Sequence, residues 1–300
     1  MCKSVGFKGG LFCYLITPFK ENGDVNLSAL ERLIEGVIQS GTDGVTCVAS
    51  TTEGVYLTEK ERFEVVEKTC EIVAGRVLID VGIGALSTHQ SLHFAEHAQK
   101  CGASTMIVEM QTYLPGFKFE DAHRFYSEIS KNVTVPLRLY NIPHTTRVDL
   151  LPEQIAEMSD IDRIDAVKDA TGDPERVKKI KELCGDRFAI FTGRHHSALE
   201  SYKYGAIGWE GAFLPVFGHD MVSLHKALST NDFTNGERIF RKMTPLFNLF
   251  NQYGVSQCIK KISSWTDIDL GKPRSPIRDL NDLQSEKLKH VVKTLGYIHY

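Results

Sequence analysis

The stretch Ile164-Asp165-Ala166-Val167-Lys168-Asp169-Ala170-Thr171-Gly172 has the composition of a short buried strand that carries a single lysine. Side chains alternate between the two faces of a strand, so Ala166 and Ala170 are expected to share a face with Lys168. Burial among small apolar side chains disfavours an ammonium group and should lower the pKa of this lysine. A neutral amine can attack a ketone and form a Schiff base. On this strand alone, however, a lysine that reaches solvent or pairs with Asp165 or Asp169 is the simpler interpretation.

Similar short apolar runs recur along the chain, and longer amphipathic stretches separate them. Runs of this kind are typical of strands that are covered on both faces. The eight expected strands are residues 11–17, 44–50, 77–83, 104–110, 135–142, 164–170, 188–193 and 206–212. Eight strand–helix units within about 225 residues predict an α/β fold, the (β/α)8 TIM barrel. A doubly wound sheet is the alternative, but no glycine-rich dinucleotide turn follows the first strand.

Helix-start signals support this alternation of strands and helices. Asn26 precedes one amphipathic stretch, Thr58 opens a capping box, and Pro152 stands at the first turn of another helix. Beyond residue 217 the strand pattern stops. The expected helices there are residues 218–228, 233–252, 254–265 and 281–296. We therefore expect a barrel over residues 1–225 and a C-terminal helical extension, residues 226–300, packed on the barrel.

Charge and cysteine content exclude several classes of function. The 300 residues carry a formal net charge of −3 and contain no basic run, so neither nucleic acid nor a membrane is expected as a partner. Seven widely spaced cysteines without a Cys-x-x-Cys pair indicate reduced thiols rather than a disulfide framework or a metal site. The first residues lack a signal-peptide pattern, so we expect a cytoplasmic protein.

The ends of the expected strands supply candidate catalytic residues. In a (β/α)8 barrel, catalytic groups lie at the C-terminal ends of the strands. Tyr140 and Lys168 come from neighbouring strands and should meet, and a tyrosine hydroxyl beside an imine can move protons. The other candidates at strand ends are Ser50, Thr51, Thr52, Gly193, His195, His196 and Glu210. Together they form a workable Schiff-base site.

A charged residue is also expected inside the barrel. Arg138 lies two positions before Tyr140, on the same face and about 6.6 Å lower. A buried arginine without a partner would be prohibitively costly. We therefore expect Arg138 either to pair with Asp80, Glu109 or Glu210, or to bind an anionic group of a substrate. A strand bulge that turns Arg138 outward is an equally good alternative.

Several motifs occur in order along almost the whole chain. They are Gly10-Leu11 with Thr17-Pro18-Phe19, Ser50-Thr51 with Glu53, Gly82-x-Gly84-Ala85, Tyr140-Asn141-x-Pro143, Asp149-Leu150-Leu151-Pro152-Glu153, and Lys168-x-Ala-Thr-Gly172. By these motifs the chain resembles the dihydrodipicolinate synthase / N-acetylneuraminate lyase family of class I aldolases.

This resemblance implies a reaction between two small molecules. Lys168 would form an imine with pyruvate or another 2-oxo acid, and a carbon–carbon bond to an aldehyde would then be made or broken. Tyr140 would act as the general acid and base. Ser50 and Thr51 would hold the substrate carboxylate and relay protons. The resemblance also implies a homo-oligomer, a tetramer or a dimer, and no cofactor.

The chain departs from the synthases of this family at several positions. Thr145 stands where the synthases carry an arginine that binds the aldehyde's carboxylate, Thr52 replaces a glycine, and Tyr113 is the one tyrosine left after the fourth strand. These changes favour a hydroxy-oxo-acid or keto-deoxy-sugar-acid aldolase over a 4-hydroxy-tetrahydrodipicolinate synthase. A barrel that binds 2-oxo acids without turnover is the alternative of another class. His195 and His196 could bind a polar or anionic aldehyde, or could be ordinary loop histidines.

Overall fold

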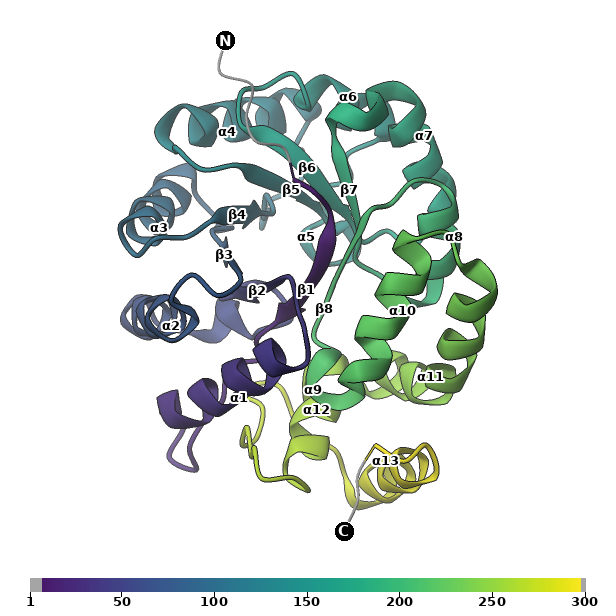
Figure 1. The fold of residues 1–300 in the computed structure, drawn as a ribbon. Helices are drawn as coiled ribbons and strands as arrows, with labels where there is room; N and C mark the ends of the chain where they lie inside the picture. The colour runs from purple at the N-terminus through teal and green to yellow at the C-terminus, as the bar shows by residue number, and fades with distance from the viewer. Residues whose placement is uncertain (1–6, 298–300) are drawn as a thin grey trace. The chain divides into compact units, whose positions relative to one another are not determined.

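The computed structural model describes residues 7–297 of the chain. Within this range eight strands close into a barrel in their order along the chain (Figure 1). The strands are β1 (Gly10–Tyr14), β2 (Gly44–Cys47), β3 (Leu78–Gly82), β4 (Thr105–Val108), β5 (Leu137–Asn141), β6 (Ile164–Asp169), β7 (Ala189–Thr192) and β8 (Gly208–Gly211). The predicted (β/α)8 barrel is therefore confirmed, and the doubly wound alternative is wrong.

Helices follow the strands and continue to the C-terminal end of the described chain. They are α1 (Leu27–Gln39), α2 (Glu59–Val73), α3 (Thr88–Lys100), α4 (Phe119–Asn132), α5 (Pro143–Thr146), α6 (Pro152–Met158), α7 (Pro174–Cys184), α8 (Ala198–Lys203), α9 (Leu214–Phe217), α10 (His219–Ser229), α11 (Phe233–Tyr253), α12 (Val255–Ser263) and α13 (Asp282–Thr294). Asn26 caps α1 and Thr58 forms the predicted capping box with Glu61 at α2. Across residues 7–297 no helix has the length and apolarity that crossing a membrane requires.

The chain divides into two compact units. The described part of the first consists of residues 7–11 and Leu78–Glu210, and that of the second consists of Phe12–Val77 and residues 211–297. The first unit contains β3 to β7 with α3 to α8, and the second contains α1, β2, α2 and the helices from α9 onward. The predicted boundary between residues 225 and 226 stays a prediction.

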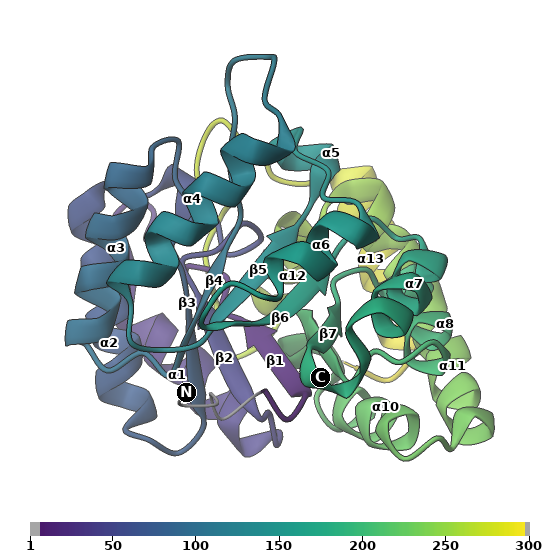
Figure 2. The same ribbon diagram turned by 90° about the horizontal axis from the view of Figure 1, so that it is seen from above.

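The pairing of β5 with β6 places the two candidate catalytic residues of the first unit at the same height along their strands. These strands are parallel neighbours (Figure 2). In their register Tyr140 lies directly beside Lys168. Two residues lower in the same pairing, Arg138 lies beside Ala166, with a register shift between Leu137 and Arg138. The tyrosine and the lysine therefore reach the carboxyl ends of their strands together, as predicted.

In the second unit, a buried charge pair joins the turn after β2 to the C-terminal helices. Lys260 Nζ, on α12, lies 3.0 Å from Glu53 Oε1, and both side chains are almost completely buried. The backbone N–H of Arg274 donates to Glu53 Oε2 at 3.0 Å, and the hydroxyl of Ser256 donates to Oε1 of the same carboxylate. Three donors thus satisfy this carboxylate, which fixes the shape of the turn.

Candidate active site

Lys168 is only 2 % exposed, although it lies near the end of its strand. Its Nζ lies 4.2 Å from the centroid of the Tyr140 ring and 3.7 Å from Glu210 Oε2. Burial lowers the pKa of Lys168 well below its ordinary value and the charge of Arg138 acts in the same direction, while two carboxylates act against it. Lys168 therefore does not reach solvent, and its amine is available in the neutral form that attacks a carbonyl group.

Arg138 is fully buried in the first unit. Its guanidinium carbon lies 4.4 Å from the ring centroid of Phe7 and 4.0 Å from that of Phe191. Nη1 lies 3.4 Å from Asp80 Oδ2 and also forms an ion pair with Glu210. The structure therefore contains the predicted ion pairs. The register shift at Arg138 does not turn the side chain outward, so that alternative is wrong.

The carboxylate of Glu210 lies between the side chains of Arg138 and Lys168. Glu210 faces Arg138 through Oε1 and Lys168 through Oε2. A guanidinium keeps its charge at every accessible pH, whereas a lysine amine can lose its proton when it is buried. Arg138 can therefore balance Glu210 while the amine is neutral. Asp80, the second acid on Arg138, also accepts a hydrogen bond of 2.7 Å from the hydroxyl of Thr105.

Two glycines, Gly193 and Gly84, leave room for the side chains of Lys168 and Glu109. A Cβ atom at Gly193 would lie 2.7 Å from Lys168 Cε and 2.8 Å from Ala170 Cβ. A Cβ atom at Gly84 would lie 2.5 Å from the Glu109 carboxyl carbon. Contacts this short do not occur for real Cβ atoms, so both positions require glycine for packing reasons rather than for an unusual backbone angle.

Replacing Gly193 by alanine is expected to slow imine formation at Lys168 by about 100-fold, because a reactive group displaced by about 1 Å loses that much rate. The rate is measured by quenching reactions with pyruvate and borohydride at successive times. Gly36→Ala is the matched control, since its new Cβ would meet only Ile268 Cδ1 at 3.6 Å. An unchanged rate in Gly193→Ala would show that the lysine tolerates the added methyl group.

The hydroxyl-rich turn after β2 lies in the second unit. Val48 adopts a left-handed φ of 49° there. Strain of this kind costs about 1–3 kcal/mol and tends to occur at functional sites. Thr52 is buried, and its hydroxyl donates to Ala49 O at 2.7 Å, so this side chain already serves the turn. Ser50 and Thr51 are half-buried. The predicted contacts of these hydroxyl groups with a substrate stay a prediction.

Two positioning residues were missed in the sequence, although each directly follows a predicted catalytic residue. Asn141 Nδ2 donates to Asp169 Oδ2 at 3.2 Å, and Asn141 Oδ1 accepts the N–H of Leu150 at 3.1 Å. Asp169 also accepts the backbone N–H of Thr171 at 3.1 Å, and burial raises the pKa of this carboxyl group. The two side chains tie the ends of β5 and β6 to the segments that follow.

The remaining candidates of the first unit lie in different environments. Thr145 is exposed on the short helix α5. The two adjacent candidate histidines differ in exposure: His195 is buried, and His196 is exposed. Tyr113, in the connection from β4 to α4, is 82 % exposed.

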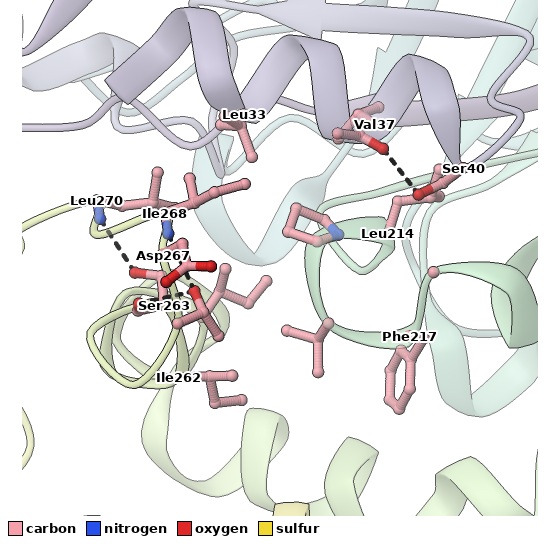
Figure 3. Close-up of a pocket in the computed structure, with 16 residues that line it drawn as sticks. Leu33, Val37, Ser40, Leu214, Phe217, Ile262, Ser263, Asp267, Ile268 and Leu270 are labelled. Atoms are coloured by element: carbon pink, nitrogen blue, oxygen red, sulfur yellow. Dashed lines mark hydrogen bonds between the residues drawn. The ribbon is translucent and has the colours of Figure 1, made fainter. Parts of the chain in front are cut away.

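A pocket of about 380 Å³ in the second unit has a different chemical character (Figure 3). Leu33 of α1, Leu214 and Phe217 of α9, and Ile262 of α12 give it apolar walls. Of the two serines that line it, Ser263 is engaged within the protein, because the hydroxyl donates to Lys260 O at 2.7 Å and accepts the N–H of Leu270 at 3.1 Å. The pocket carries no amine near a proton donor, so we place the candidate active site at Lys168.

The chain matches the dihydrodipicolinate synthetase family over residues 7–295. It belongs to this family. It is 29% identical over 296 residues to a 4-hydroxy-tetrahydrodipicolinate synthase of Thermodesulfovibrio yellowstonii, which covers 97% of this chain and 99% of the relative. It is also similar to the dihydrodipicolinate synthase structure from Aquifex aeolicus, with a TM-score of 0.92, 26% identity, and coverage of 96% and 98% of the two chains.

A further similar structure contains pyruvate. The chloride-inhibited dihydrodipicolinate synthase from Acinetobacter baumannii was solved in complex with pyruvate, and it is 25% identical with a TM-score of 0.91 over 97% of this chain and 100% of that one. Dihydrodipicolinate synthetase family enzymes make or break carbon–carbon bonds through a lysine Schiff base. The predicted class, a class I lyase or synthase, is therefore confirmed.

Proposed function

We propose that Lys168 forms an imine with pyruvate or another 2-oxo acid and that the enzyme joins this acid to an aldehyde, or cleaves the product of that addition. The observation that carries this proposal is a buried lysine of lowered pKa beside a buried tyrosine. Structural lysines are seldom buried, because burial of the ammonium is costly. A lysine held in this state has the properties of a Schiff-base nucleophile.

The proposed steps balance without a cofactor. The neutral amine adds to the ketone carbon, and loss of water from the resulting carbinolamine gives the imine. Loss of a proton from the adjacent carbon gives an enamine, because the imine nitrogen accepts the electron pair. The enamine carbon attacks the aldehyde, the aldehyde oxygen takes up a proton, and water releases the product from Lys168. Each proton transfer needs a positioned acid or base, and Tyr140 is the group beside the amine.

The other predicted residues have supporting roles in this proposal. Ser50 and Thr51 donate hydroxyl hydrogen bonds to the 2-oxo acid's carboxylate, and Thr52 shapes their turn. Gly193 leaves space for the lysine, and Arg138 with Glu210 sets the charge around it. Thr145 takes the position at which the synthases carry an arginine.

The substrate pair that we favour is a 2-oxo acid with the aldehyde of a hydroxy-oxo acid or a keto-deoxy-sugar acid, because Thr145 cannot replace a guanidinium. Synthesis of 4-hydroxy-tetrahydrodipicolinate is the second candidate, supported by the relative that matches 97% of this chain. We further propose a cytoplasmic homo-oligomer. The exposed apolar side chains Tyr113, Leu114 and Phe117 support that proposal, since such groups are often buried between subunits.

Reductive trapping tests the imine directly. Incubation with pyruvate and borohydride is expected to add one reduced pyruvate to the peptide that contains Lys168, as measured by peptide mass spectrometry. The Lys168→Ala variant should carry no adduct at this position. Lys260 is a matched internal control, because it is equally buried but lies 3.0 Å from a carboxylate that holds it in place.

Absence of labelling at Lys168 would overturn the proposal. If neither pyruvate nor longer 2-oxo acids label Lys168 in the unmodified protein, the proposed function fails and the non-catalytic barrel is favoured. Labelling of Lys260 to the same extent would show that the reaction reports burial alone.

A further inference from the structure

Arg194 directly follows Gly193 at the carboxyl end of β7, beside the imine-forming lysine. Its Nε donates to Ala170 O at 3.1 Å, two residues beyond Lys168. Its Nη2 lies 2.7 Å from His144 Nε2, on α5. Two hydrogen bonds, one to the residue after β6 and one to α5, thus fix the guanidinium at the rim of the site, where it is half-buried.

The contact with Arg194 determines which nitrogen of the His144 imidazole carries the proton. A guanidinium has donors but no acceptor, so Nε2 of His144 accepts the bond and the ring carries its proton on Nδ1. His144 is exposed, so its Nδ1–H remains a potential donor to a bound molecule. Burial and the nearby Arg194 both lower the pKa of His144. The ring is therefore neutral near pH 7 and adds a donor without a second charge.

His196 completes this cluster from the other side. A Cβ atom on Gly172 would lie 2.7 Å from His196 Nε2 and 3.7 Å from Arg194 Cγ, so the two side chains lie over the turn that follows β6. Burial and Arg194 also lower the pKa of His196. The cluster consequently presents one permanent positive charge together with two imidazoles.

The charge of Arg194 is not balanced within the described chain. No carboxylate of residues 7–297 forms an ion pair with it. Arg138 provides a contrast, since two buried acids engage it. A half-buried guanidinium that is oriented by hydrogen bonds and lacks an acidic partner is suited to a carboxylate or phosphate group of a ligand.

We propose that Arg194, with His144 and His196, binds the negatively charged end of the aldehyde substrate. This inference rests on the proposed function and narrows its second substrate to anionic aldehydes. The product is then a hydroxy-oxo acid that carries a second acidic group.

The test compares each charged aldehyde with a neutral counterpart. With pyruvate as the first substrate, kcat/KM is measured for succinic semialdehyde and for butanal. A second pair, glyceraldehyde 3-phosphate and glyceraldehyde, distinguishes a phosphate ligand from a carboxylate. The unmodified protein should prefer the charged member of at least one pair.

The variant Arg194→Met should lower that preference, the ratio of the two kcat/KM values, by about 100-fold, the effect of a lost charge-assisted hydrogen bond. The loss should appear mainly in KM. His144→Ala should lower the ratio less, since it removes a neutral donor. Arg187→Met is the matched control, because Arg187 precedes the same strand at its other end and pairs with Asp160 at 3.1 Å. Its ratio should not change.

Two outcomes would overturn the inference. One is equal kcat/KM for charged and neutral aldehydes in the unmodified protein, and the other is an unchanged preference in Arg194→Met. Neither outcome depends on imine formation, which needs pyruvate alone. A protein that traps pyruvate on Lys168 but shows no charge preference retains the proposed function and lacks the anion site.

Discussion

Replacing Arg138 by leucine is expected to lower the free energy of unfolding by about 3–5 kcal/mol, the typical cost of removing one partner of a buried ion pair. The reason is the pair of acids that the guanidinium engages. Without it, Asp80 and Glu210 would remain buried with their negative charges facing each other across the vacated space. The two aromatic rings around the guanidinium would also lose a favourable contact. Urea-induced unfolding, followed by circular dichroism, measures the loss.

A double variant separates charge from packing. Arg138→Leu with Glu210→Leu removes a cation and an anion together, so it should recover a substantial part of the lost stability. Arg187→Leu is the control for removing an arginine from an exposed ion pair, which should cost less than about 1 kcal/mol. Equal losses in Arg138→Leu and Arg187→Leu would mean that the buried charges do not stabilise one another.

The barrel could be predicted because its signals are local. Each strand is a short apolar run, and caps such as Asn26 and Thr58 mark the helix starts that lie between strands. Strand alternation also placed Arg138 and Tyr140 on one buried face, and the order of the strands in the barrel placed Tyr140 beside Lys168. These predictions needed no knowledge of distant contacts.

The details that failed or were missed depend on contacts between distant segments. Alternation alone could not decide which acids engage Arg138, because Asp80 and Glu210 lie far from it in the sequence. The role of Asn141 depends on where its partners Asp169 and Leu150 fold back against it. Local patterns carry no information about such pairings, since they are set by the strand register and by the loops.

Lys168→Met is the second variant with a large expected effect, and it acts in opposite directions on function and stability. Trapping of pyruvate should disappear, because the nucleophile is gone. The folded protein should nevertheless be at least as stable as the unmodified one. Methionine has a similar length and no amine to desolvate, and Arg138 remains to balance Glu210.

The pH dependence of this gain in stability tests whether the buried amine is neutral. The folded-state pKa of Lys168 lies well below 10.5, so the unfolded chain binds a proton that the folded chain excludes over the window between the two pKa values. The unmodified protein therefore gains stability as pH rises through this window. The advantage of Lys168→Met should be full below the folded-state pKa and should vanish as pH approaches 10.5.

Urea midpoints for both proteins at a series of pH values give this comparison. A protonated Lys168 held by Glu210 predicts the reverse, because methionine would then remove one cation from a buried group of charges. A lower midpoint for Lys168→Met at neutral pH would therefore contradict the neutral amine. It would also require another group to remove the proton before imine formation. Glu210, whose Oε2 lies 3.7 Å from the nitrogen, is a carboxylate placed to accept that proton.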